Sequence, residues 1–216
     1  MAEQVGASSG QPLGRSAMTI GWGWWLFWVM ANLAGWAVLG WVTAGFTTGG
    51  WAETLSLSPL VLFLSWVVPG VLQWLVLRRK VSRAGWWVLA TTVGYFVGWN
   101  GAIVLVGVVG WLGSNYVSGI VGETVGWILL WGSYGAIIGV PQWLVLRRQV
   151  ARAGWWVLVS TVAWVGGSLA IGIASWALFG TVYGVITGIA LAWLLRNRSS
   201  APTPQPPRLE TLPAGD

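Results

Sequence analysis

The sequence predicts an all-α integral membrane protein, a bundle of six transmembrane helices built from three parallel two-helix repeats. Composition, the length of the apolar runs and an internal repeat together predict this fold class. Of the 216 residues, 56% are hydrophobic and 7% are charged, whereas soluble proteins carry about a quarter charged residues. Because so few charges cannot cover the surface of a soluble domain, we expect hydrocarbon around the chain.

Six apolar runs are long enough to cross a bilayer, which takes about 20 helical residues at about 1.5 Å each. We expect membrane spans at about 20–46, 57–77, 86–112, 126–146, 155–174 and 177–195. The stretch 155–195 is twice what one crossing needs, so the chain must fold back near residues 175–180. Residues 1–18 and the proline-rich residues 198–216 are expected to be disordered cytoplasmic tails that flank a membrane domain over residues 19–197.

The chain repeats itself. Nineteen of the 24 positions in residues 70–93 recur unchanged 69 positions later. Fainter copies flank this pair: residues 23–26 (Gly-Trp-Trp-Leu) resemble the Trp-Trp openings at 86 and 155, and residues 183–196 resemble residues 134–147. We therefore expect three hairpins, over about 19–79, 86–148 and 155–197, each with a Trp-Trp helix leading out and a Gly/Arg helix leading back.

The basic residues support the same topology, because all eleven fall on one side of a six-span arrangement. They are Arg15, Arg78, Arg79, Lys80, Arg83, Arg147, Arg148, Arg152, Arg196, Arg198 and Arg208. The positive-inside rule then places both termini and the basic loops in the cytoplasm, with the chain in the cell (inner) membrane. The basic residues from Arg78 to Arg198 are expected to fix this topology and to contact anionic lipid head groups, rather than nucleic acid.

Missing residue types limit the chemistry. The chain has no cysteine and no histidine, so we expect no disulfide, no zinc site and no histidine base. The expected spans contain no Asp, Glu, Lys, Arg or His, which argues against ion-coupled transport. Glu53 and Glu123 lie in the outer loops, where a carboxylate in the first turn of a helix is favourable. We expect no enzyme activity, no catalytic residue, no metal and no cofactor.

Small residues and tryptophans predict how the helices pack. Glycine ridges at 94/98, 135/139 and 180/184/188 are expected to bring helix backbones close together. Trp74 and Trp143 each lie one turn before an arginine, Arg78 or Arg147, and are expected to stack on its guanidinium group.

A second set of residues could contact a ligand. Among the 21 tryptophans, Trp36, Trp99 and Trp131 lie away from the basic loops; Asn32 and Asn100 are expected to be the most interior polar side chains. Gln73 and Gln142 occupy matching positions and are expected to hydrogen-bond across helices. The third hairpin has Ala192 near the equivalent position, so a three-fold polar ring is expected to be incomplete.

The element Gln-Trp-Leu-Val-Leu-Arg-Arg followed by Arg-Ala-Gly-Trp-Trp, within residues 66–165, resembles one found in small, uncharacterised bacterial multi-pass membrane proteins. That family has no assigned activity, so the resemblance implies a membrane location alone.

Two functions stay open at this point. The first is a non-enzymatic scaffold or assembly subunit, or a binder of an apolar ligand such as a lipid, isoprenoid or pigment, through Trp-lined grooves. The alternative is a passive channel or facilitator for a small neutral solute, lined by Asn32, Asn100, Gln73 and Gln142. Expected partners are membrane lipids, other membrane subunits or an apolar small molecule.

Overall fold

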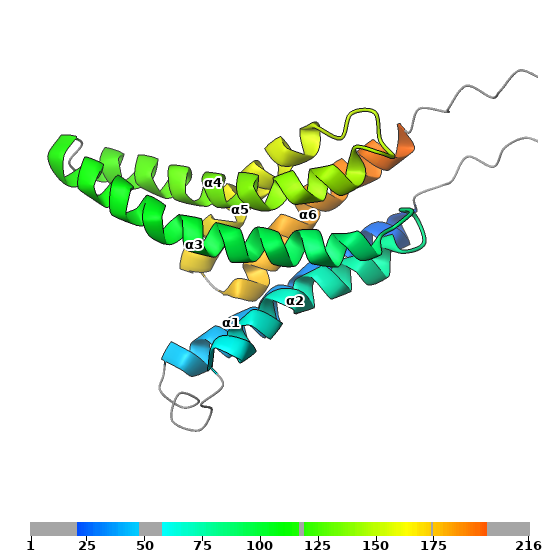
Figure 1. Cartoon of the computed structure of the whole chain (residues 1–216), viewed down its shortest axis with the longest axis horizontal. Coiled ribbons are helices and arrows are strands. Elements are labelled where there is room, and N and C mark those ends of the chain that lie inside the picture. Colours follow the sequence, from blue (N-terminus) through cyan, green and yellow to red (C-terminus); the bar gives the residue numbers. More distant parts are fainter. Residues whose placement is uncertain (1–20, 48–57, 117–118, 174, 198–216) are drawn as a thin grey trace, which may run out of the picture.

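The computed structural model describes residues 21–47, 58–116, 119–173 and 175–197, and this part of the chain is helical apart from its loops (Figure 1). Six helices follow one another: α1 (Trp22–Thr47), α2 (Ser58–Leu77), α3 (Gly85–Tyr116), α4 (Ile120–Leu146), α5 (Trp155–Ile173) and α6 (Trp176–Arg196). Each expected span falls on one of these helices, and the expected fold-back near residue 175 is the α5–α6 turn. The largest difference is at α4, which begins six residues before the expected 126. The two tails lie outside the described residues.

The six helices form a closed ring. Each helix packs against its neighbours in the sequence, and α6 packs back against α1. Within the described residues, three segments are long and apolar enough to cross a membrane: Trp22–Ala44, Gly122–Leu146 and Trp176–Arg196. Phe63–Leu77 and Trp155–Ile171 are shorter apolar helical segments.

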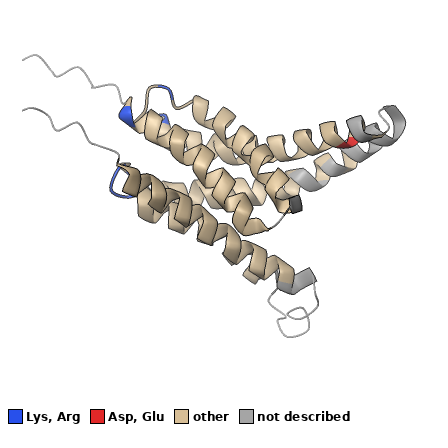
Figure 2. Ribbon diagram, turned by 180° about the vertical axis from the view of Figure 1, so that it is seen from behind, with Lys and Arg blue, Asp and Glu red and all other residues tan. Residues whose placement is uncertain are grey.

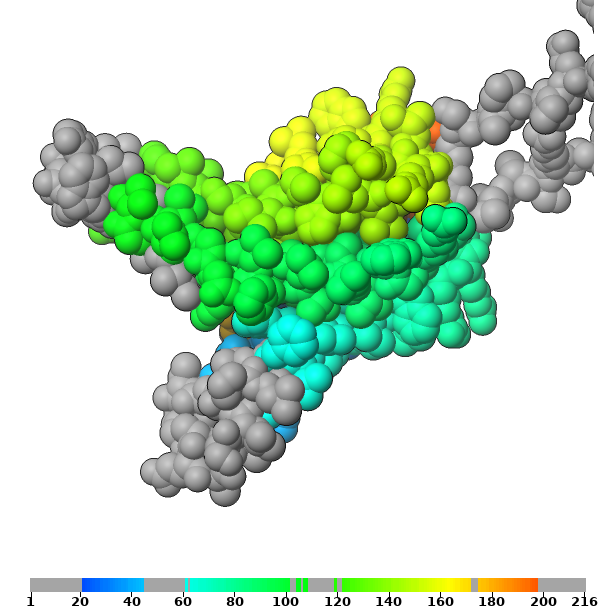
Figure 3. Space-filling view, in the orientation of Figure 1, coloured from blue at the N-terminus to red at the C-terminus, as the bar shows by residue number. Residues whose placement is uncertain are grey.

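Charge separates the two ends of the ring. All the described lysine and arginine residues lie at one end, here called the basic end, and Glu123 lies in the first turn of α4 at the other (Figure 2). Away from the basic end, the α1–α2 pair and the α3–α4 pair diverge, so the molecule is hollowed between them in the space-filling view (Figure 3). Glu53 lies outside the described residues.

Glycines set the close approach between helices, as the sequence predicts. A Cβ atom added at Gly180 would lie 2.6 Å from the carbonyl oxygen of Asn32, so α6 meets the backbone of α1 there. A Cβ atom at Gly135 would lie 2.8 Å from the carbonyl oxygen of Ser160, and one at Gly94 would lie 2.9 Å from Cα of Ile138. The α6–α1, α4–α5 and α3–α4 contacts therefore all depend on a glycine.

Aromatic side chains fill the interior in two layers. At the basic end, the rings of Trp28, Trp87 and Trp156 meet edge to face, with centroids 6.2 Å and 5.5 Å apart. Eight residues further along the same three helices, the rings of Trp36, Tyr95 and Trp164 form a closed triangle with centroids 5.6, 5.1 and 6.3 Å apart. Edge-to-face pairs at these distances are favourable beyond the area they bury.

Trp28 corrects the sequence comparison of the first hairpin. Residues 23–26 were expected to match the Trp-Trp openings, which would give Trp25 the place of Trp87 and Trp156. Trp28 takes that place instead, because it is fully buried in the same cluster as Trp87 and Trp156. The periodicity of a helix makes an offset of three residues hard to detect in a sequence rich in tryptophan.

Candidate functional site

A buried polar layer lies between the two aromatic layers and is built around the two predicted glutamines. Nε2 of Gln73 on α2 donates to Oδ1 of Asn32 on α1 at 2.8 Å, and its Oε1 accepts from Nε1 of Trp87 on α3 at 2.8 Å. All three side chains are fully buried. The expected cross-helix hydrogen bonding of Gln73 is confirmed, and one amide joins three helices.

Gln142 makes the same connection one hairpin later. Its Nε2 donates to Oγ1 of Thr91 on α3 at 3.0 Å, and its Oε1 accepts from Nε1 of Trp156 on α5 at 3.0 Å. Thr91 lies four residues after Trp87, just as Asn32 lies four residues after Trp28. The two glutamines thus hold equivalent partners on successive helices.

The third side of this layer differs from the expectation. Ala192 is buried and apolar. The indole of Trp28 instead finds its acceptor at Thr187, earlier in α6. Nε1 of Trp28 donates to Oγ1 of Thr187 at 3.0 Å, and that hydroxyl donates to the carbonyl oxygen of Tyr183 at 2.6 Å. Thr187 therefore accepts from a buried indole as the two glutamines do, but its own hydrogen bond stays within α6, so it joins two helices and the polar ring is incomplete on this side.

The seven predicted ligand-contact residues do not line one pocket. The hydrogen bonds of the polar layer occupy the amides of Asn32, Gln73 and Gln142. Trp36 is buried in the aromatic triangle. Trp131 stacks on Trp164 with ring centroids 5.8 Å apart.

The expectation that Asn100 is interior is wrong. Asn100 is exposed on α3, where its amide donates to the carbonyl oxygen of Phe96 within the same helix at 2.7 Å. Trp99 beside it is 53% exposed and contacts Trp66 of α2. The outward position follows from the turn of the helix, which directs Tyr95 and Gly98 inward and Asn100 outward.

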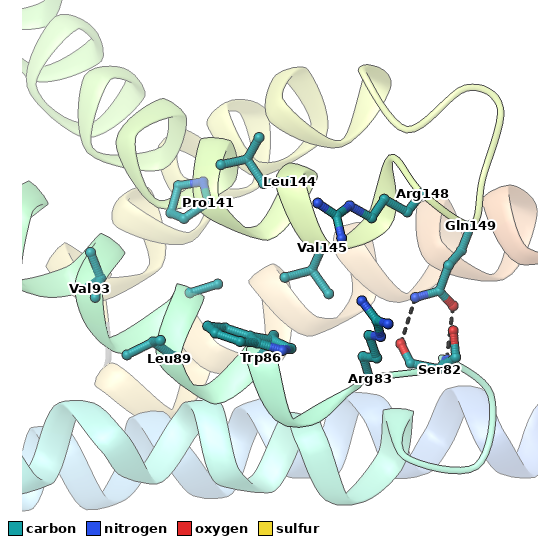
Figure 4. Close-up of a pocket in the computed structure, with 11 residues that line it drawn as sticks. Ser82, Arg83, Trp86, Leu89, Val93, Pro141, Leu144, Val145, Arg148 and Gln149 are labelled. Carbon is teal, nitrogen blue, oxygen red and sulfur yellow. Dashed lines mark hydrogen bonds between the residues drawn. The ribbon is translucent and has the colours of Figure 1, made fainter.

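A groove runs along the outer face of the α3–α4 pair at its basic end (Figure 4). Its volume is about 690 Å³, within the range of about 300–1,000 Å³ of small-molecule sites. The apolar wall consists of Trp86, Leu89, Ala90, Val93, Pro141, Leu144 and Val145, and the mouth consists of Ser82, Arg83, Arg148 and Gln149. Trp86 is 60% exposed, so the groove opens to the surroundings of the ring rather than to its interior.

Two arginines face one another at the mouth of this groove. Arg83 comes from the α2–α3 loop and Arg148 from the start of the α4–α5 loop, and both guanidinium groups point toward the space above Trp86 (Figure 4). The amide of Gln149 fixes the distance between the two loops, because its Oε1 accepts from the backbone N–H of Ser82 at 2.9 Å and its Nε2 donates to the backbone carbonyl of Ser82 at 2.6 Å.

Arg83 has an uncommon backbone conformation. Its φ of 58° makes it the one non-glycine residue with a positive φ among those the structure describes. The left-handed region costs a residue with a Cβ atom about 1–2 kcal/mol. Backbone outliers of this kind cluster at functional sites.

The other predicted arginine contacts are confirmed. The guanidinium carbon of Arg78 lies 5.8 Å from the ring centroid of Trp74, and that of Arg147 lies 5.4 Å from the ring centroid of Trp143. These two arginines stiffen the ends of α2 and α4, whereas Arg83 and Arg148 are directed to the groove.

Sequence reasoning grouped Arg83 and Arg148 with the other basic residues and did not single out the groove. The available signal was the repeat itself, since Arg83 and Arg148 lie at the two ends of the one hairpin, about 86–148, that has arginine at both positions. Within the described residues, no cluster of acidic side chains could hold a metal ion.

Comparison with known proteins gives no family: no protein-family model matches the chain, and neither the curated proteins nor the solved structures contain a similar one. The resemblance of the repeated element to small bacterial membrane proteins stays a prediction.

Proposed function

We propose that this protein is a non-enzymatic, six-span membrane protein of the cell (inner) membrane that holds an apolar ligand in the α3–α4 groove. The observation that carries the proposal is the groove itself: an apolar wall with Trp86 and two arginines at its mouth, facing outward. Such a site takes a molecule with a long apolar part from the bilayer without opening the bundle.

Several features support six crossings and three parallel hairpins. Even the shortest helices, α2 and α5, have 20 and 19 residues, which reach about 30 Å at about 1.5 Å per residue. Gln73 and Gln142, which match at a spacing of 69, are both fully buried, and each accepts a hydrogen bond from the tryptophan 14 residues later in the sequence. With the basic end in the cytoplasm, the arginines of the groove lie at the depth of the lipid head groups.

The packing of the interior favours a ligand binder over the alternative, a channel for a small neutral solute. Two aromatic layers and the hydrogen-bonded layer between them occupy the centre of the ring. Asn100, which a solute path would need, is exposed on α3. Of the other polar candidates, Gln73 is bonded to Asn32, and Gln142 is bonded to Thr91 and Trp156. A scaffold function is compatible with the same groove if a partner's apolar segment occupies it.

Native mass spectrometry after mild extraction tests the proposal. We expect the wild-type protein to retain an amphiphilic molecule and the Leu144→Trp variant to lose it, because the larger ring fills the groove. Leu158→Trp is the matched control, since Leu158 is an exposed leucine of α5 outside the groove. Equal retention by Leu144→Trp and the wild type would contradict the proposed function.

A further inference from the structure

We infer that the occupant of the α3–α4 groove is an anionic phospholipid, whose phosphate binds between Arg83 and Arg148 while an acyl chain lies along the apolar wall. This inference rests on the proposed function and names the chemical class of its ligand.

Charge is the first observation in favour of an anionic occupant. The described part of the chain contains a single carboxylate, Glu123, and it lies at the opposite end of the bundle (Figure 2). No carboxylate of the described chain lies near the two guanidinium groups. An anion that binds from outside the protein is therefore best suited to neutralise their charge.

Geometry makes the mouth of the groove a prepared site. The two hydrogen bonds from Gln149 to the backbone of Ser82 hold the α2–α3 loop against the end of α4. The left-handed backbone of Arg83 belongs to the same loop, one residue after Ser82. Arginine suits such a site better than lysine, because its planar fork donates two parallel hydrogen bonds to phosphate oxygens. Contacts within the protein thus hold both arginines in place for one phosphate before the ligand binds.

The wall beneath the arginines matches the rest of a phospholipid. Leu89, Val93 and Leu144 are all between 42% and 51% exposed, and they continue the groove from its charged mouth toward the middle of α3 and α4. Trp86 lies at the boundary, where an indole ring favours the depth of the glycerol and carbonyl groups. A free inorganic anion would use the arginines but leave this apolar surface uncovered. Basic pockets between helices on the cytoplasmic side are a known mode of anionic lipid recognition.

The third hairpin provides an internal comparison. Arg152 there corresponds to Arg83, but its guanidinium carbon lies 5.9 Å from the ring centroid of Trp193, a residue that corresponds to Leu144. Asn197 stands in the place of Arg148, and its amide donates to the carbonyl oxygen of Trp193. In that hairpin a tryptophan covers the arginine and the second positive charge is absent. Within the described residues, only the second hairpin combines an uncovered pair of arginines with a leucine in place of this tryptophan.

Lipid selectivity measured by native mass spectrometry tests the inference. The whole protein, purified in detergent, is incubated with an equimolar mixture of phosphatidylglycerol and phosphatidylcholine of identical acyl chains. We expect one phosphatidylglycerol molecule to be retained over phosphatidylcholine by roughly tenfold, because both lipids carry the phosphate but the choline of phosphatidylcholine adds a positive charge beside the two guanidinium groups. Arg83→Gln and Arg148→Gln are each expected to remove this preference. Arg79→Gln, which removes an equal charge from the same end outside the groove, is expected to keep it.

A second variant separates folding from binding. Arg83→Gly removes the guanidinium group and relieves the left-handed backbone, so it should keep or raise thermal stability while the preference is lost. Equal retention of both lipids by the wild type, with both lost in Leu144→Trp, would overturn the anionic inference and leave the proposed function standing. Loss of preference in Arg79→Gln as large as in Arg83→Gln would overturn the site in favour of diffuse attraction. Lipid retention unchanged in Leu144→Trp would contradict the proposed function itself.

Discussion

Valine at position 180 is expected to prevent the ring from closing. A Cβ atom there would lie 2.6 Å from the carbonyl oxygen of Asn32 and 2.8 Å from Cβ of Trp36. Both belong to α1, and the first is a backbone atom that cannot rotate away. Because α6–α1 is the contact that closes the ring, we expect Gly180→Val to cost about 3 kcal/mol, with loss of the monodisperse protein in detergent. Size-exclusion chromatography and a thermal melt measure this.

Gly23→Ala is the control for this prediction. Gly23 lies in the first turn of α1, and an added Cβ atom would meet no atom within 4 Å. Alanine favours a helix over glycine by about 1 kcal/mol, so this variant should be at least as stable as the wild type. A melting temperature of Gly180→Val equal to that of the wild type would show that α6 does not approach α1 as described.

Leucine at position 73 is expected to lower the free energy of unfolding, because two buried polar groups lose their hydrogen-bond partner. Gln73→Leu keeps a side chain of similar size but leaves the indole N–H of Trp87 and the amide oxygen of Asn32 without their bonds. Buried unpaired polar groups cost about 1–3 kcal/mol each in soluble proteins, and cross-helix hydrogen bonds in membranes average about 0.6 kcal/mol. For the two groups together we expect the free energy of unfolding to fall by about 2 kcal/mol. Reversible unfolding in mixed detergent gives the free energy.

The matched control replaces another amide. Asn100→Leu removes an exposed amide whose bond stays within α3, so its unfolding free energy should stay within about 0.5 kcal/mol of the wild type. Should Gln73→Leu be equally neutral, the polar layer would contribute no stability, and its glutamines would be candidates for ligand contact again.

The helix positions and the cross-helix role of the glutamines could be predicted because they follow from local signals. Apolar runs of fixed length give the helices, and an amide one or two turns inside an arginine must find a partner in the interior. Glycine ridges give the close contacts for the same reason: small residues four apart lie on one face of a helix. These arguments need no knowledge of how the helices are rotated about their axes.

The orientation of side chains around each helix could not be predicted. Uniformly apolar helices show little contrast between faces, so Asn100 was expected inside although it lies outside. Residues 23–26 resemble the Trp-Trp openings, although Trp28 is the residue buried with Trp87 and Trp156. The role of Thr187 also depends on the distance between α6 and α1, which Gly180 and Gly188 make short. The groove combines the rotation of two helices with the conformation of two loops, and Arg83 and Arg148 are 65 residues apart in the sequence.

Cysteine accessibility tests most directly whether this is a membrane bundle with one basic, cytoplasmic end. The chain has no cysteine, so single cysteines report without background. Ser82 and Ala151 are exposed in the two basic loops, and Glu123 and Ser175 are exposed at the opposite end. We predict that Ser82→Cys and Ala151→Cys react with a membrane-impermeant maleimide only after the cells are opened, whereas Glu123→Cys and Ser175→Cys react in intact spheroplasts. Labelling of positions 82 and 151 from opposite sides of the membrane would contradict the account.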